Sequence, residues 1–228
     1  MKQLFIGLII TISITGCKTA VVAQKKDKMD ATFEKFDFES WDNNYANYKK
    51  GTTEYSYFMK DGAEIYPDIT GTIIIPPKPD FYSIYKSYYK NNGHIKEKGK
   101  LLGIKNSLIK IGTWYYFDST STKPREVNED KKFGKFDYNK LLTFLTNKGD
   151  INIHTGMNRD KLEIEFYSTD SSLQKLWKVY LLQEVHDLGD KIGMKGRLYF
   201  IDGNTGEMIK SEQLSAYKGV YPQALYMR

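Results

Sequence analysis

Cysteine, histidine and arginine are scarce in this chain of 228 residues. The single cysteine, Cys17, cannot form a disulfide within the chain or build a cysteine cluster for metal or redox chemistry. Three histidines occur, and none forms the His-x-x-x-His spacing of a helical zinc site. Only four of the 34 basic residues are arginine, the side chain best suited to two-pronged contacts with phosphates and bases. These shortages argue against a disulfide scaffold, a zinc enzyme and a nucleic-acid-binding protein.

Long hydrophobic runs are also lacking. The longest covers residues 4–14, whereas a membrane-spanning helix needs about 20 residues. The run follows a cationic start and has the length of a signal-peptide core. It ends in Ile14-Thr15-Gly16-Cys17, which resembles a bacterial lipobox: an aliphatic residue, two small residues, and the cysteine that is acylated. The resemblance implies that residues 1–16 are a signal peptide and that Cys17 carries lipid.

Lysine is abundant and dispersed, and the formal net charge is +6. A dispersed lysine excess favours solubility and mild attraction to anionic envelope surfaces. Residues 17–40 begin with a polar, lysine-rich stretch, which predicts a flexible tether between the lipid and the folded part. Within this stretch, Met29, Phe33 and Phe36 have the spacing of one face of a short amphipathic helix.

Residues 41–132 show the pattern of antiparallel β-structure. Residues 55–60 alternate, Asp61-Gly62 forms a hairpin turn, and residues 63–66 return. Asn91-Asn92-Gly93 marks a second turn, because asparagine and glycine tolerate positive φ. The 18 tyrosines can build the core of such a region or form a recognition surface, and we favour the core because half of each strand points inward.

Two segments of this region resemble MORN-type repeats. Residues 88–95, Tyr-Tyr-Lys-Asn-Asn-Gly-His-Ile, are similar to the tyrosine, polar, Asn-Gly, aliphatic hairpin of that family. Residues 111–118, Ile-Gly-Thr-Trp-Tyr-Tyr-Phe-Asp, are similar to its Gly-x-Trp-x-x-Tyr strand. The resemblance implies stacked antiparallel hairpins, and this variant recurs in bacterial antitoxin-like and lipoprotein sequences.

Residues 133–228 follow a different pattern. Asp137 suits the N-cap of a helix, apolar residues recur at positions 138, 141, 142 and 145, and Gly149 suits the position just past the helix end. Strands are predicted over residues 161–167, 176–182, 196–202 and 207–210. Residues 199–209, Tyr-Phe-Ile-Asp-Gly-Asn-Thr-Gly-Glu-Met-Ile, are similar to the closing hairpin of PepSY-type domains. This resemblance implies a helix followed by a small antiparallel sheet, in a non-catalytic module proposed to bind or restrain peptidases.

Candidate catalytic residues are few. His94 falls in a turn and His154 in a loop after the helix, where exposed or structurally paired histidines are common. His186-Asp187 could act as a base and its orienting carboxylate, but no serine or cysteine nucleophile motif accompanies the pair. A weak hydrolase that uses His186 and Asp187 remains an alternative.

Three further patterns have a simple structural interpretation. The glycine-rich stretch over residues 189–196 lacks the Gly-Lys-Ser/Thr of a phosphate loop, and we expect a mobile loop there. The segment Asp202-x-Asn204-x-Gly206 does not match the residue pattern of a calcium-binding loop, and we predict a turn there. Glu163 and Glu165 share one face of a strand, which is typical of its solvated side.

Together these patterns predict a β-rich α+β protein, with antiparallel hairpins followed by a helix packed on a small antiparallel sheet. The expected segments are a signal peptide (1–16), a tether (17–40), a β-region (41–132) and a PepSY-like module (133–228). As a whole the chain resembles a family of uncharacterised lipoproteins of Bacteroidetes-type bacteria, through Lys35-Phe36-Asp37-Phe38, residues 54–62 and residues 112–116.

The functional expectation is a non-enzymatic module that binds a protein or peptide. We expect it to be anchored by lipid at Cys17, on the periplasmic side of the outer membrane. The expected partner is another envelope or secreted protein, without a cofactor, metal or nucleic acid. An immunity lipoprotein that neutralises a secreted toxin is the alternative from another class.

Overall fold

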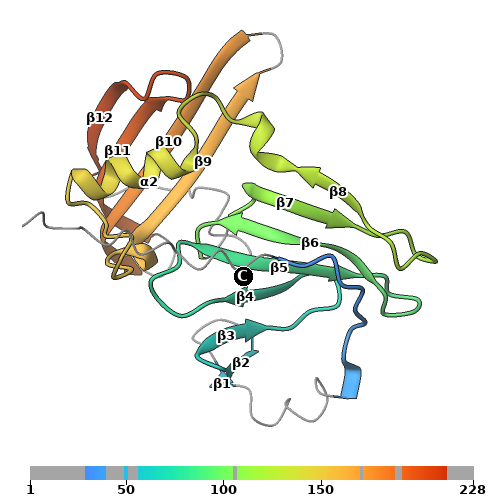
Figure 1. Ribbon diagram of the computed structural model, residues 1–228. Coiled ribbons are helices and arrows are strands. Elements are labelled where there is room, and N and C mark those ends of the chain that lie inside the picture. The colour runs from blue at the N-terminus through green and yellow to red at the C-terminus, as the bar shows by residue number, and fades with distance from the viewer. Residues whose placement is uncertain are drawn as a thin grey trace, which may run out of the picture.

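The computed structural model describes residues 29–39, 49–50, 56–104, 107–169, 172–187 and 192–214 (Figure 1). Their strands form two antiparallel sheets, with the order β1-β2-β3-β4-β5-β6-β7-β8 in the large sheet and β12-β11-β10-β9 in the small one. Between the two sheets in sequence lies the helix α2 (Tyr138–Asn147). The predicted β-rich α+β class is confirmed.

Each strand of the large sheet pairs with the next one along the chain, so the sheet is a meander of hairpins. Its strands are β1 (Lys49–Lys50), β2 (Ser56–Lys60), β3 (Ala63–Tyr66), β4 (Thr72–Ile75), β5 (Tyr82–Tyr88), β6 (Ile95–Leu102), β7 (Lys110–Tyr116) and β8 (Arg125–Asn128). The predicted turn at Asp61-Gly62 joins β2 to β3. Both residues have positive φ, 50° and 79°, as a two-residue turn that matches strand twist requires.

The small sheet has four strands, two of which, β10 and β11, are the longest of the described chain. The four are β9 (Leu162–Thr169), β10 (Ser172–Asp187), β11 (Ile192–Asp202) and β12 (Met208–Leu214). The helix α2 lies across one face of this sheet (Figure 1). Two short 3₁₀ turns, η2 (Glu129–Lys132) and η3 (Arg159–Lys161), flank the helical part of the chain.

The predicted helix signals are confirmed. The Asp137 carboxylate accepts a hydrogen bond from the Lys140 backbone N–H at 3.0 Å, which satisfies a free N–H of the first turn. Leu141 and Leu145 are fully buried on the face toward the sheet. Gly149 has φ 74° just past the helix end, where glycine avoids the steric cost of a left-handed residue.

One hydrophobic core joins the two sheets. Phe81, Leu102 and Ile111 of the large sheet and its loops belong to the same buried cluster as Leu141 of α2 and Trp177 of β10. Loops add a polar connection, because the buried Arg159 guanidinium donates to the Asp80 carbonyl at 3.0 Å. The predicted boundary between residues 132 and 133 falls inside this cluster, at the buried Phe133.

The tether predicted over residues 17–40 needs correction in its described part. Residues 29–36, here called the strap, run along the large sheet and are not helical. The Phe36 N–H donates to the Gly93 carbonyl at 2.8 Å, and the Ile95 N–H donates to the Glu34 carbonyl at 3.0 Å. Phe36 is buried in a second core with Tyr88 and Ile95. The strap is therefore extended because pairing and burial on the sheet exceed what a short isolated helix gains.

The mobile loop predicted over residues 189–196 also needs correction, because residues 192–196 belong to β11. The β10–β11 ladder continues past an irregularity between Leu182 and Glu184, so that His186 pairs with Gly193 and Asp187 pairs with Ile192. Backbone pairing thus includes residues 192–196, where the sequence pattern indicated a glycine-rich loop.

Candidate binding groove

The three histidines do not lie together in a site. His94 directly precedes β6. Its Nδ1 lies 3.1 Å from the Ser119 carbonyl oxygen, and its ring packs edge-on against Phe33 with the ring centres 5.0 Å apart. His154 is exposed on the turn after α2. His186 lies at the far end of β10, and its side chain, like that of Asp187, is outside the described residues. The hydrolase alternative is therefore untested.

The carboxylates singled out from sequence have structural partners. The Asp202 carboxylate accepts hydrogen bonds from the backbone N–H groups of Thr205 and Asn204, both at 2.8 Å, which hold the pKa of Asp202 below its usual value. This is a turn, as predicted. In the part of the chain that the structure describes, no three His, Cys, Asp or Glu residues are grouped to hold a metal ion.

Glu163 and Glu165 lie on the edge strand β9. Glu165 is 3.5 Å from the Lys178 ammonium and accepts a hydrogen bond from the Tyr167 hydroxyl at 2.5 Å. Burial, with a smaller effect of Glu165, raises the pKa of Glu163. The alternation of charged and apolar residues in this strand predicted a solvated face for the two glutamates. Glu163 is only partly exposed, so this face is less solvated than predicted.

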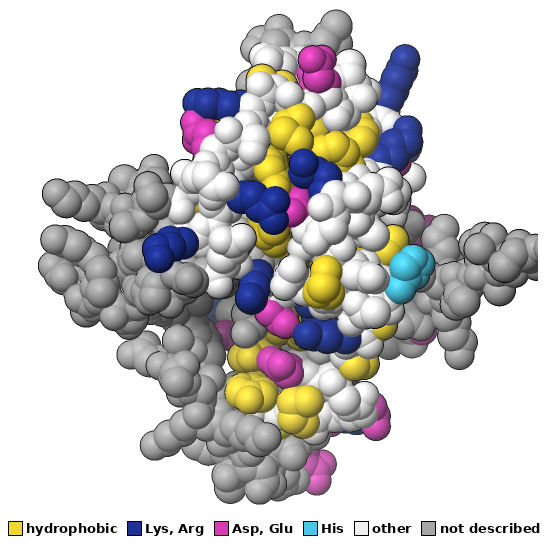
Figure 2. Space-filling view, turned by 90° about the vertical axis from the view of Figure 1, so that its left-hand side faces the viewer, with side chains coloured by type: hydrophobic (Ala, Val, Ile, Leu, Met, Phe, Trp, Pro, Cys, Tyr) yellow, Lys and Arg dark blue, Asp and Glu magenta, His cyan; other side chains and the backbone are white. Residues whose placement is uncertain are grey.

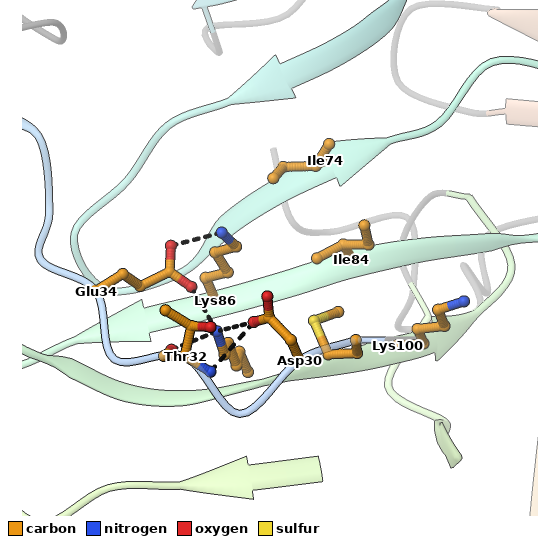
Figure 3. Close-up of a pocket in the computed structure, with 9 residues that line it drawn as sticks. Asp30, Thr32, Glu34, Ile74, Ile84, Lys86 and Lys100 are labelled. Atoms are coloured by element: carbon orange, nitrogen blue, oxygen red, sulfur yellow. Dashed lines mark hydrogen bonds and ion pairs between the residues drawn. The ribbon is translucent and has the colours of Figure 1, made fainter. Parts of the chain in front are cut away.

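A groove of about 470 Å³ lies between the strap and the large sheet (Figure 3). Two rows of cross-strand neighbours in the large sheet place the side chains of this wall on one face. Ile74, Ile84 and Lys100 are neighbours across β4, β5 and β6, and Lys86 and Lys98 are neighbours in the next row. The strap forms the other wall, with Met29, Asp30, Thr32 and Glu34.

Lys98 is the centre of the charged part of this groove. Its side chain is only 3% exposed, and its ammonium reaches three acceptors of the strap. These are the Thr32 carbonyl at 2.7 Å, a Glu34 carboxylate oxygen at 3.0 Å and an Asp30 carboxylate oxygen at 3.4 Å. A buried ammonium has three donors to satisfy, and the strap supplies all three acceptors.

Glu34 binds two lysines at once. One carboxylate oxygen contacts Lys98, and the other lies 2.6 Å from the Lys86 ammonium. Asp30 is more peripheral, with its side chain 71% exposed. Backbone and side-chain hydrogen bonds from Thr32, and to a lesser degree Lys98, hold the pKa of Asp30 below its usual value.

In the rest of the groove, the floor is apolar and the rim carries a positive charge. Ile74 and Ile84 form the floor, at the end away from Glu34 (Figure 3). The Lys100 ammonium lies at the rim, 3.8 Å from the centre of the Tyr82 ring. The groove thus offers aliphatic surface next to positive charge.

The opposite face of the same strands carries stacked aromatic rings. Trp114 is fully buried, stacks on Tyr85 with the ring centres 6.0 Å apart, and lies under the Lys110 ammonium at 3.9 Å. Gly99 makes room for the indole, because a Cβ there would lie 2.3 Å from the Trp114 ring. Trp114 is thus buried on this face, whereas Tyr85 beside it is only partly buried.

The groove lysines were not among the residues that the sequence singled out. A signal exists, because Lys96, Lys98 and Lys100 alternate along one strand, and a lysine on the inward-facing side requires a partner. The sequence does not show that the partner is Glu34, 64 residues earlier than Lys98. Elsewhere the charge is mixed as expected, and Lys and Arg lie among Asp, Glu and hydrophobic side chains on the face in Figure 2.

Cys17, the expected lipid attachment site, lies outside the described residues. Among the residues described, no helix has the length and apolar character needed to cross a bilayer. Comparison with known proteins finds no family model that matches the chain, and neither a curated protein nor a solved structure similar to it.

Proposed function

We propose that this chain is a lipid-anchored protein of the bacterial cell envelope that binds a protein or peptide partner without catalysing a reaction. The observation that carries the proposal is the groove over β4, β5 and β6. It combines an isoleucine floor with fixed positive charges, and its volume of about 470 Å³ is in the usual range for ligand sites. Aliphatic and charged groups side by side suit an amphipathic peptide segment.

The contacts of the groove lysines support a binding role. The Lys98 ammonium is occupied by three acceptors of the strap. The Lys86 ammonium is paired with Glu34 at 2.6 Å. Such lysines act as fixed charges that orient a neighbouring chain, as they already orient the strap.

The order of elements supports the two family resemblances. Consecutive antiparallel hairpins, as in β1 to β8, are what MORN-type repeats imply. A helix followed by a four-stranded antiparallel sheet is the order of PepSY-type modules, which are proposed to bind peptidases. Both resemblances favour binding over catalysis.

The anchor places this groove close to a membrane. Eleven residues separate Cys17 from Met29, where the strap begins. Fully extended, they span about 40 Å. Because the strap is docked on the sheet, the working tether is shorter than residues 17–40. On the periplasmic side of the outer membrane, the groove would meet envelope or secreted proteins.

Metabolic labelling tests the anchor. Radiolabelled palmitate is expected to enter the wild-type protein and not the Cys17→Ser variant, and the wild type is expected in the membrane fraction. Absence of label from the wild type, or equal label in the Cys17→Ser variant, contradicts the proposed anchor.

Affinity capture from native envelopes tests the groove. The tagged wild type is compared with Ile84→Asp, which places a charge on the floor, and with Met157→Asp, a control on an exposed turn residue. Circular dichroism checks that each variant is folded. We expect a partner that the wild type and Met157→Asp retain and that Ile84→Asp loses. The same proteins captured by all three contradict the role of the groove.

A further inference from the structure

Strand β12 is an outer strand of the small sheet (Figure 1). Among the strands that the structure describes, it pairs with β11 alone. None of its seven residues is buried, and Ile209 is 55% exposed. An outer strand presents backbone N–H and C=O groups on which another strand can form. The exposure of β12 therefore makes it a candidate surface for strand pairing.

Outer strands in natural proteins often carry a lysine or a β-bulge that discourages such pairing. β12 has both, namely Lys210 and a shift in register opposite Phe200 and Ile201. The shift lies at the start of the strand, and residues 210–214 pair with β11 without interruption. The lysine repels an incoming strand only where no acidic residue lies opposite. Whether β12 can pair thus depends on the register.

The charges of β12 favour one register with a second copy of the same strand. Lys210 and Glu212 lie on one face, because side chains two residues apart point the same way. In an antiparallel pair of copies related by a two-fold axis, a centre at residue 210 places lysine opposite lysine, and a centre at residue 212 places glutamate opposite glutamate. A centre at Ser211 places each Lys210 opposite Glu212 of the other copy. This is the register in which the charges attract.

This register does not require an unpaired charge in the single chain. Lys210 and Glu212 form an ion pair within the strand, and their side chains are 61% and 39% exposed. An ammonium has three donors and a carboxylate accepts several hydrogen bonds, so both groups can keep this pair and add one across the interface. The two copies then form a ring of alternating charges.

We propose that β12 pairs antiparallel with β12 of a second copy of this chain, in the register centred on Ser211, so that the two small sheets join into one. The other outer strand, β9, does not offer this match, because any register that brings its Glu163 and Glu165 opposite their copies pairs like charges. A contact made by one strand is smaller than a stable interface of about 1,200–2,000 Å², so the dimer is weak and depends on concentration. The proposal goes beyond the proposed function, since the groove lies on the large sheet.

Cysteine cross-linking of the full chain in living cells tests the register. Ser211→Cys places two thiols directly opposite one another, with Cα atoms about 4.5–5.5 Å apart, which suits a disulfide. In the matched control Gln213→Cys, also at an exposed position, the two copies are four residues out of step, or about 14 Å apart along the strands. After mild oxidation we expect at least about tenfold more covalent dimer from Ser211→Cys than from Gln213→Cys. The wild type, with Cys17 as its single cysteine, gives the background.

Charge reversal tests the pairing, with Ser211→Cys as the reporter in every chain. Lys210→Glu places glutamates opposite one another, and Glu212→Lys places lysines opposite one another. Each is expected to lower the yield of dimer about tenfold, because two cross-strand pairs become repulsive. When the two variants carry different tags and are expressed together, the mixed dimer should form as the parent dimer does. Attraction across the interface is then restored, although neither chain keeps the ion pair within its own strand.

The double reversal Lys210→Glu/Glu212→Lys restores both pairs and should cross-link as the parent does, and circular dichroism checks that each variant is folded. Cross-linking of Gln213→Cys equal to that of Ser211→Cys overturns the proposal, as does a yield from Ser211→Cys no higher than the wild-type background. Single reversals without effect, or a mixed dimer no more abundant than the dimers of the single variants, overturn it too. None of these results bears on the groove, which envelope capture tests separately.

Discussion

Replacing Glu34 with glutamine keeps the size of the side chain and removes the carboxylate that bridges Lys86 and Lys98. In the wild type its two oxygens lie 2.6 Å and 3.0 Å from the two ammonium groups. The change removes the negative charge and one of the two acceptor oxygens, so the remaining amide oxygen can accept from only one of the two ammonium groups while the new NH₂ group faces the other. The Lys98 ammonium, whose side chain is 3% exposed, keeps the Thr32 carbonyl at 2.7 Å and the Asp30 carboxylate at 3.4 Å. The change also leaves two lysines in repulsion across the ladder.

The expected loss in the free energy of unfolding is about 2–3 kcal/mol. Removing one partner of a buried ion pair typically costs about 3–5 kcal/mol. The expected loss falls below this range because Lys98 keeps the Thr32 and Asp30 acceptors and because the Glu34 side chain is 28% exposed. The strap can also undock locally and expose Lys98 to water, which limits the global loss. The effect should therefore be largest in the strap itself.

Urea unfolding gives the global change, and hydrogen exchange gives the local one. The amides of Phe36 and Ile95 hydrogen-bond across the strap, and they should exchange much faster in Glu34→Gln. Glu39→Gln, a control at an exposed acid nearby, should stay within about 0.5 kcal/mol of the wild type.

The double variant Glu34→Gln/Lys98→Met shows whether the two residues act together. Its loss should be smaller than the sum of the two single losses by about 1–3 kcal/mol, as for residues of one ion-pair network. Additive losses, or unchanged exchange at Phe36 and Ile95 in Glu34→Gln, would refute the proposed coupling of the strap to the sheet.

Three further predictions concern the rest of the fold. Asp137→Ala removes the N-cap of α2, and urea unfolding should show a loss of about 1 kcal/mol; no loss would contradict its capping role. Gly99→Ala should lose about 1–3 kcal/mol in urea unfolding and shift the Trp114 emission, because its Cβ would lie 2.3 Å from the indole; wild-type stability would contradict this. Burial raises the pKa of Glu163 above its usual value, so the ionised form of Glu163 is less favourable in the folded protein than in the unfolded chain. Stability linked to this group is therefore lost as pH rises through the folded pKa. Glu163→Gln should melt at a higher temperature than the wild type at neutral pH and at the same temperature once Glu163 is protonated in both states; an unchanged difference across pH would contradict it.

Local features of the fold could be predicted from the sequence. The Asp61-Gly62 turn, the Asp137 cap and the Gly149 stop each depend on residues adjacent in the chain, and each lies where predicted. Strand alternation also placed Leu162 and Ile164 toward the core. These signals depend on backbone φ values and on short-range hydrogen bonds, which neighbouring residues largely determine.

Features that depend on distant partners could not be predicted in this way. The spacing of Met29, Phe33 and Phe36 fits a helix, but these residues pack as extended chain against residues around positions 88–117. The groove requires Glu34 to meet lysines more than fifty residues later. Neither the periodicity of the strap nor that of β6 contains this information, because pairing across a sheet is set by register and tertiary contacts.

The most direct test of the proposed role is site-specific photo-crosslinking in living cells. A photoreactive residue at position 74, on the groove floor, is compared with one at Met157, on an exposed turn. The account predicts a discrete crosslinked protein from position 74 that is absent from position 157 and is lost when Lys100→Glu is added. No adduct from position 74, or the same adducts from both positions, would contradict the claim that the groove binds a partner.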